Sequence, residues 1–205
     1  MIHQYEQLEK NNLEITKAFK TQKIGKLLRD SNIRKCEGFS TTHLFQLLIL
    51  LVFEGKNLFR LLDSKQGKEH PQKDAFYRFL NRLTYGWRRF LFALVVQVIQ
   101  SFEGLTSKSR IKVLIIDDSL FSRFRSKQVE LSARVYDHVS GKMVKGFSML
   151  TLGWSDGYSF IPLDFNMLSS ANKNNRLVEI DTRIDMRTHG YKRRQDALSF
   201  LKVFT

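Results

Sequence analysis

Cysteine, proline and long apolar runs are all scarce in this chain of 205 residues. The single cysteine, Cys36, excludes an internal disulfide, and one thiol cannot form a zinc site built from several cysteines. The longest apolar runs, Leu44 to Phe53 and Phe90 to Ile99, are well short of the roughly 20 residues that span a bilayer. We therefore predict no membrane contact, and both runs are expected to form core helices.

Negative charge is also in short supply, because 34 Lys and Arg residues face 20 Asp and Glu residues. The resulting net charge of +14 attracts polyanions and speeds their capture, so nucleic acid is the first partner to expect. An export signal is missing, since residues 1–17 are polar and carry charges of both signs, and a cytoplasmic protein is expected. Apolar residues make up 42% of the chain, which is enough for a core.

Apolar residues in the N-terminal half recur at helical spacing. A first helix is predicted to begin at Ser40 or Thr41, either of which can cap it, and its apolar residues cover most sides, as in the middle of a bundle. A second helix begins at Lys73, and a longer third helix follows Gly86. The residues expected to face inward on the second helix are Phe76, Phe79, Leu80 and Leu83.

The period changes from helical to extended after the linker at residues 104–110. Ile111 to Asp117 is a continuous apolar run, which predicts a strand buried on both faces. Further strands are predicted for residues 128–138, 145–154 and 158–165, and a helix for residues 193–205. The first two of these strands read as a hairpin, and Pro162 places the third at a sheet edge. The predicted fold class is α+β.

The first predicted strand ends on two adjacent carboxylates, Asp117 and Asp118. Two divalent ions can activate the nucleophile and stabilise the leaving oxygen in phosphodiester cleavage, and Mg²⁺ accepts one or two protein carboxylates beside substrate phosphates and water. Because side chains alternate along a strand, one of the two aspartates is expected to be a ligand. The competing interpretation is that Asp118 and Ser119 begin an ordinary turn after a core strand.

Basic residues interleaved with aromatic ones surround this strand in the sequence. The arginine guanidinium pairs with two phosphate oxygens at once, so the group as a whole predicts a DNA or RNA groove, although each arginine alone is more typical of a solvated surface. The residues of this part predicted to contact DNA are Arg123, Arg125, Lys127, Lys192, Arg193 and Arg194.

The segment from Ile115 to Ser170, with HGYKRRQDA after it and KDAFYRFLNRLTYGWRRFL before it, resembles DDE transposases of the insertion-sequence-four type. The resemblance extends over residues 39–197. It implies a helical DNA-binding region at residues 1–106 and an incomplete RNase H-like catalytic domain with a mixed sheet at residues 107–205. It further implies that the intact parent uses Mg²⁺ to cut and rejoin DNA at the ends of a mobile element. An open sheet edge also allows self-association, so a homodimer is a further candidate.

In this family the first catalytic Asp usually lies two positions before a Ser or Thr, which corresponds to Asp117 and Ser119. Asp117 is thus the implied metal ligand, with Asp118 as the alternative catalytic residue. The family's second Asp follows the helix that here corresponds to residues 193–205, and its Glu lies later still; neither has a counterpart in this sequence. The expectation is a truncated transposase with an incomplete catalytic set and an open apolar sheet edge.

The resemblance also assigns DNA binding to the helical half. The polar face of the second helix could enter a major groove while neighbouring arginines contact phosphates. The residues concerned are Lys73, Tyr77, Arg78, Asn81, Arg82, Arg88 and Arg89. The alternative is that this face is the solvent-exposed side of an ordinary bundle helix.

Two other functions stay open at this point. A non-catalytic DNA-binding remnant or regulator would bind DNA in a salt-sensitive way that neither Asp117→Asn nor magnesium alters. A metal-dependent nuclease unrelated to transposition would need Asp156 or Asp164 within about 8 Å of Asp117, because the ligands of one Mg²⁺ ion all lie close to it.

Overall fold

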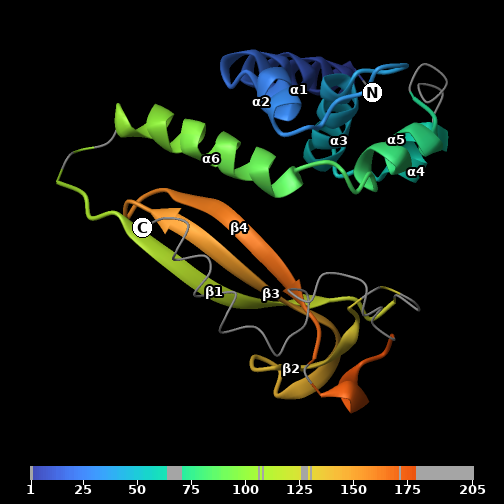
Figure 1. Cartoon of the computed structure of the whole chain (residues 1–205), viewed down its shortest axis with the longest axis vertical. Helices are drawn as coiled ribbons and strands as arrows, with labels where there is room; N and C mark the ends of the chain where they lie inside the picture. Colours follow the sequence, from blue (N-terminus) through green and yellow to red (C-terminus); the bar gives the residue numbers. More distant parts are fainter. Residues whose placement is uncertain are drawn as a thin grey trace. The chain divides into compact units, whose positions relative to one another are not determined.

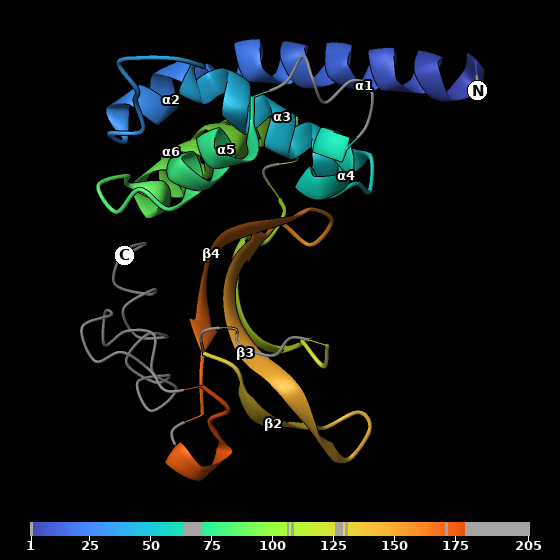
Figure 2. The same ribbon diagram turned by 90° about the vertical axis from the view of Figure 1, so that its right-hand side faces the viewer.

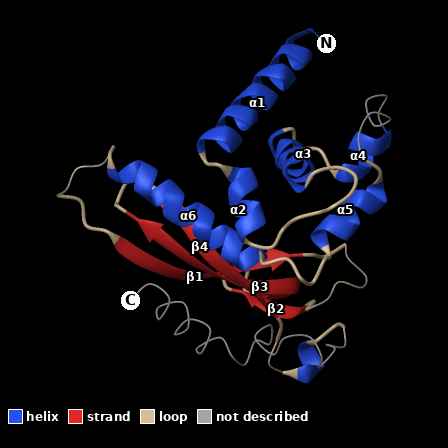
Figure 3. Ribbon diagram, turned by 45° about the horizontal axis from the view of Figure 1, so that its top comes forward, coloured by secondary structure: helices blue, strands red, loops and turns tan. Residues whose placement is uncertain are grey.

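The computed structural model describes residues 2–63, 71–105, 107, 109–125, 129, 131–170 and 172–178. The chain divides into two compact units, Met1–Gly104 and Leu105–Thr205. The α-helices of the described residues lie in the first unit and the strands in the second, as Figure 1 and Figure 3 show. The predicted α+β class, with helices before strands, is therefore confirmed. The helix predicted for residues 193–205 lies outside the described residues.

Six helices are described in the first unit, and three of them match predicted ones. Their bounds are Ile2–Thr21 (α1), Ile24–Asp30 (α2), Thr41–Phe53 (α3), Leu58–Asp63 (α4), Lys73–Leu80 (α5) and Trp87–Glu103 (α6). The predictions missed α1, the long helix near the N-terminus in Figure 2, and the short α2 and α4. The sequence of α1 mixes charges of both signs, and Ile15 is its one buried residue among residues 10–21, so the apolar stripe is weak.

Helix α3 begins at Thr41 because Ser40 is its N-cap: the Ser40 hydroxyl accepts a hydrogen bond from the His43 N–H at 3.2 Å. Three leucines at helical spacing, Leu44, Leu47 and Leu51, are buried. The last turn is not, since Val52 and Phe53 are 75% and 67% exposed. The prediction of a helix surrounded on most sides therefore holds for its first turns and fails for its last.

Edge-to-face aromatic contacts dominate the core of the first unit. The rings of Phe79 and Trp87 lie 5.2 Å apart at 83°, and those of Phe45 and Phe90 lie 5.2 Å apart at 87°. Leu80 and Leu83 were expected to face inward on the second predicted helix, but both are exposed: Leu80 is the last residue of α5, and Leu83 lies beyond its end. Within the described residues, every helix is too short or too polar to cross a membrane.

An antiparallel sheet of four strands forms the second unit, and β3 runs through its centre. The strands are Val113–Ser122 (β1), Ala133–Asp137 (β2), Lys142–Ser155 (β3) and Phe160–Leu168 (β4), followed by a 3-10 turn at Lys173–Asn175. Gly146 of β3 pairs with Ser122 of β1 and with Ala133 of β2, so those two strands lie on opposite sides of β3 (Figure 2). The predicted hairpin corresponds to β2 and β3. Pro162 lies beside a register shift on β4, which pairs with β3 alone among the described strands, as expected of an edge.

The strand that carries the aspartates differs from its prediction in both position and burial. It spans Val113–Ser122 instead of ending at the acids. All residues from Val113 to Asp118 are exposed, and the four apolar ones are 37–43% exposed. The prediction that this strand is buried on both faces is therefore wrong. Within the described residues β1 pairs with β3 only, so it is an edge strand and not a central one.

Candidate nucleic-acid-processing site

Asp117 and Asp118 lie in the middle of β1, where Asp117 pairs with Thr151 and Asp118 with Leu150. Because the strand continues to Ser122, the interpretation of Asp118 and Ser119 as the start of a turn is wrong. Successive side chains of a strand point to opposite faces, so the two carboxylates belong to different faces of the sheet. Both residues are exposed.

Two residues with hydroxyl groups neighbour Asp117 on its face of the sheet. The Ser119 Oγ donates a hydrogen bond to Asp117 Oδ2 at 3.1 Å, and Thr151 stands opposite Asp117 on β3. Asp118 shares its face with Leu150, which is 4% exposed. Hard oxygen donors are what Mg²⁺ prefers, and the Asp118 face carries them too, because Asn166 and Asp164 pair with Leu150 and Leu152. The geometry therefore leaves both aspartates as candidate ligands.

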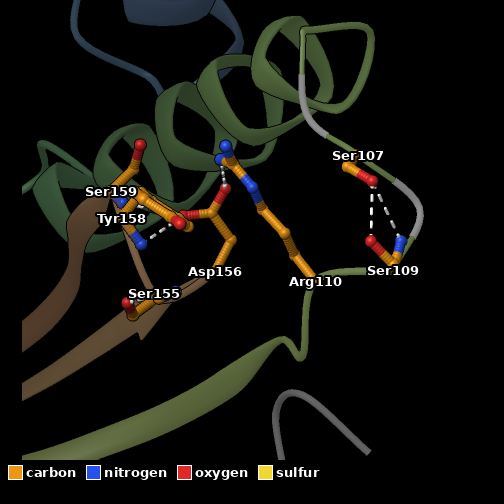
Figure 4. A network of polar contacts seen from close by, with 8 residues as sticks. Ser107, Ser109, Arg110, Ser155, Asp156, Tyr158 and Ser159 are labelled. Atoms are coloured by element: carbon orange, nitrogen blue, oxygen red, sulfur yellow. Dashed lines mark hydrogen bonds and ion pairs between the residues drawn. The ribbon is translucent and has the colours of Figure 1, made fainter.

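Asp156 serves a different purpose, because it is buried at the turn between β3 and β4. Its carboxylate accepts hydrogen bonds from the Arg110 Nη1 at 3.0 Å, the Ser159 N–H at 2.7 Å and the Tyr158 N–H at 3.1 Å (Figure 4). The Ser159 hydrogen bond, helped by those of Arg110 and Tyr158, lowers the pKa of this carboxyl from its ordinary value of 3.8 despite burial. The guanidinium of Arg110 also lies 4.1 Å from the centre of the Tyr158 ring.

The other acids predicted from the sequence and described in the structure do not converge on Asp117, whereas Asp181 and Asp185 lie outside the described residues. Asp164 pairs with Leu152, one position along from the Thr151 row, and is therefore on the opposite face. Asp137 closes the turn after β2, where the Ser140 hydroxyl and the Val139 N–H donate to it and lower its pKa. In the described part of the chain, no three His, Cys, Asp or Glu residues are grouped to hold a metal ion. This arrangement does not favour a nuclease completed by Asp156 or Asp164.

The basic residues predicted around the sheet are only partly described. Arg123 and Arg125 are exposed, and their guanidinium groups lie 4.4 Å and 5.4 Å from the ring centres of Phe121 and Phe124. Such cation–π contacts hold each charge over an aromatic face. The other candidates, Lys127, Lys192, Arg193 and Arg194, lie outside the described residues.

Helix α5 exposes the polar face that the sequence suggested. Its buried residues Phe76 and Phe79 anchor one side. On the other side a hollow of about 430 Å³ is lined by Tyr77, Arg78, Asn81 and Arg82. The Lys73 ammonium lies 5.4 Å from the centre of the Tyr77 ring. Arg88 and Arg89 belong to α6 and do not line this hollow.

A larger cavity of about 990 Å³ lies beside α5, and one of its walls was missed by the sequence analysis. Arg78 and Arg82 line it from the α5 side, whereas Arg34, Lys35 and Phe39 line it from the loop between α2 and α3. The stretch IRKCEGF contains a signal that could have found this wall: two adjacent cations close to a glycine and an aromatic residue.

An α+β chain with net charge +14, a basic cavity in its helical unit and exposed aspartates on the first strand of its sheet has the makeup of a nucleic-acid-processing protein. A family model described as DDE superfamily endonuclease matches residues 47–197, so the chain belongs to that family and contains a DDE transposase-like nuclease domain. Divalent metal is in general use among these nucleases, and DNA is their substrate. Searches of curated proteins and of solved structures gave no match.

Proposed function

We propose that this chain acts in DNA transposition of the insertion-sequence-four type, with an RNase H-like sheet unit and a helical unit that binds element-end DNA. The observation that carries the proposal is the family match over residues 47–197, which includes both α5 and the aspartate pair of β1. The exposed polar face of α5 and the net charge of +14 support DNA binding by the helical unit.

In this proposal Asp117 is the first carboxylate of the catalytic set. Bound Mg²⁺ would polarise the scissile phosphate and activate the attacking oxygen. Asp117 would hold the ion, and the Ser119 hydroxyl, 3.1 Å from Asp117 Oδ2, fixes the carboxylate orientation. Asp118 remains the alternative ligand, and Arg123 and Arg125 would contact phosphates near the strand.

Helix α5 is proposed as the element that contacts duplex DNA. Tyr77, Arg78, Asn81 and Arg82 share one hollow, so they can meet the same stretch of DNA. Lys73 of the same helix, with Arg88 and Arg89 of α6, would add phosphate contacts that position the duplex without reading its sequence.

The proposal is tested with duplex DNA from the ends of the mobile element, by fluorescence anisotropy and by strand cleavage with Mg²⁺. Arg78→Ala should weaken duplex binding by about tenfold, since one charge-assisted phosphate or base contact contributes roughly 1–3 kcal/mol. Lys10→Ala, which removes an exposed charge from α1, is the matched control and should leave the affinity unchanged. Equal loss in both variants would show that net charge, and not α5, governs binding.

A second candidate function is a non-catalytic DNA-binding module. It is favoured by the exposed basic residues that line the α5 hollow, because they can hold DNA without a metal site. Comparison of Asp117→Asn with Asp118→Asn separates the two functions. If the wild type and Asp118→Asn cleave DNA with Mg²⁺ and Asp117→Asn does not, the chain is a nuclease. If the wild type and both variants bind DNA without cleaving it, the chain is a DNA-binding module.

The expected homodimer also belongs to this proposal. Edge strand β1 leaves Val113, Leu114, Ile115 and Ile116 37–43% exposed, and such an edge can pair with a second copy. Sedimentation velocity should then show a dimer that Ile115→Lys converts to a monomer, because a charged side chain on an edge strand opposes pairing with a second copy.

A further inference from the structure

We propose that the cavity between the α2–α3 loop and α5, here called the basic groove, binds an unpaired DNA strand. Arg34, Lys35 and Phe39 form its loop wall, and Arg78 and Arg82 form its α5 wall. The inference rests on the proposed DNA-binding function and adds to it a second, single-stranded substrate class. The loop wall does not line the hollow on α5, so substitutions in the loop wall separate single-strand binding from duplex binding.

Three hydrogen bonds, two from side chains and one from the backbone, fix the loop wall to the segment after α5. The Tyr85 hydroxyl donates to the Arg34 carbonyl at 3.0 Å, and the Asn32 side-chain amide donates to the Thr84 carbonyl at 2.9 Å. The Gly86 N–H donates to the Ser31 carbonyl at 3.0 Å, and a Cβ at Gly86 would lie only 2.9 Å from that oxygen. This close approach requires glycine, so the groove is preformed and a ligand need not order its frame.

The charges that line the basic groove fit a phosphodiester strand. Each wall contributes two cations, and the lining also contains two acids, Glu37 and Asp74. The groove therefore carries an excess of positive charge. None of the four cations forms an ion pair with a described residue, and the Arg82 guanidinium lies over the Tyr85 ring at 5.4 Å. Cations that are not committed to protein carboxylates can pair with phosphate oxygens on both sides of a strand.

The size and the aromatic rim of the basic groove favour an unpaired strand over a duplex. A volume of about 990 Å³ is in the range of sites that enclose small organic ligands, so it can admit a nucleotide, whereas a duplex could only lay its outer backbone on the rim. Phe39 lines the groove and is 46% exposed, and the centre of its ring lies 6.0 Å from that of the stacked His43 ring. Stacking of a base on such a ring, with phosphates held by cations, is how single strands are bound without sequence preference.

An acidic peptide is the competing occupant. It would also find the cations, but it offers no planar base to stack on Phe39, whereas Glu37 and Asp74 would repel phosphates and carboxylates alike. The combination of an exposed ring with cations on both walls therefore favours the nucleotide strand.

Cys36 provides a direct reporter, because it lines the basic groove, is exposed and is the only thiol of the chain. The rate of its reaction with a maleimide is measured on the whole protein without metal, in the presence of oligodeoxythymidylate, blunt duplex DNA or polyglutamate. Saturating oligodeoxythymidylate should slow the reaction at least about tenfold, and duplex or polyglutamate should slow it less than about twofold. Protection by polyglutamate equal to that by the oligonucleotide would overturn the proposal in favour of an acidic peptide.

Substitutions confined to the loop wall separate this inference from duplex binding. Phe39→Ala should weaken oligodeoxythymidylate binding about tenfold, in line with the cost of losing one base–aromatic stack. Arg34→Ala with Lys35→Ala should weaken it further and reduce its salt dependence. Both proteins should bind element-end duplex as the wild type does, with Lys10→Ala as the charge control. Unchanged single-strand affinity in the loop-wall variants would refute the groove while leaving the role of α5 intact, and loss of duplex binding in Arg78→Ala tests that role alone.

Discussion

Two aspartates of the sheet unit show how surroundings decide what a carboxylate does. Asp156 is 2% exposed and accepts three hydrogen bonds, so its oxygens are occupied by the protein. Asp117 is exposed on a strand, and the Ser119 hydroxyl donates to one of its oxygens. The Asp156 carboxylate therefore stabilises the fold, and the Asp117 carboxylate is open to an outside ligand.

Asp156→Asn should destabilise the protein at neutral pH, with a fall in Tm of roughly 5 °C, because an amide cannot pair with Arg110 as an anion does. The folded state depresses the pKa of Asp156 below 3.8, so its contribution to stability is present above that pH and is lost as the pH falls through the lower, folded pKa. Thermal unfolding followed by circular dichroism at pH 7 and pH 3 should show a difference between variant and wild type that narrows in acid.

The control for this experiment is Asp30→Asn, since Asp30 is an exposed carboxylate at the end of α2. It should change Tm by less than about 2 °C at either pH. A difference between Asp156→Asn and wild type that stayed constant from pH 7 to pH 3 would contradict the assignment.

Among the single residues, the sequence identified the aspartates of β1 but not the loop wall of the basic groove. Asp117 and Asp118 stand out because an apolar run leads directly into them. Arg34 and Arg78 are far apart along the chain, and only the packing of α5 against the core brings their side chains to one cavity. Local pattern contains no information on such a pairing, which is why the loop wall was missed.

Among the secondary-structure elements, β1 and β3 leave no space for a side chain at Gly146. A Cβ built there would lie 2.3 Å from the Phe121 carbonyl oxygen, and backbone cannot move aside as a flexible side chain can. Gly146→Ala should therefore lower the free energy of unfolding by about 1–3 kcal/mol, as overpacking usually does. Urea denaturation followed by circular dichroism measures this change.

Gly104→Ala is the matched control, because nothing lies within 4 Å of a Cβ at that position and its φ is −71°. It should leave the unfolding free energy unchanged or raise it slightly, since alanine reduces the freedom of the unfolded chain. Equal destabilisation in both variants would show that the loss comes from removing glycine in general and not from the contact between β1 and β3.

The type of each predicted element was easier to infer than its extent. Helical spacing identified α3, α5 and α6, because tertiary packing agrees with their apolar periods. The apolar run at residues 111–117 predicted a strand but not its continuation to Ser122 or its exposure. Length and burial of a strand depend on which neighbours pair with it, and those neighbours are distant in sequence.

For the molecule as a whole, charge does not separate the two units. Residues 1–104 contain 17 of the 34 basic and 10 of the 20 acidic residues, so each unit has a net charge of +7. Both units should attract DNA electrostatically. A specific role for the helical unit must therefore come from the arrangement of its charges around α5, and this is testable on the isolated unit.

Residues 1–104 expressed alone should fold, because the core built from Leu28, Ile33, Leu44, Phe76 and Phe79 lies within that unit. The fragment should bind element-end duplex through α5, with a smaller slope of log K against log salt than the whole chain, because fewer phosphates are contacted. Anisotropy titrations from 50 to 200 mM salt measure both slopes. Arg78→Ala should weaken binding by the same factor in the fragment as in the whole chain, since its contacts lie within one unit. A fragment with full helical circular dichroism but no DNA binding would instead place the duplex contacts on the sheet unit.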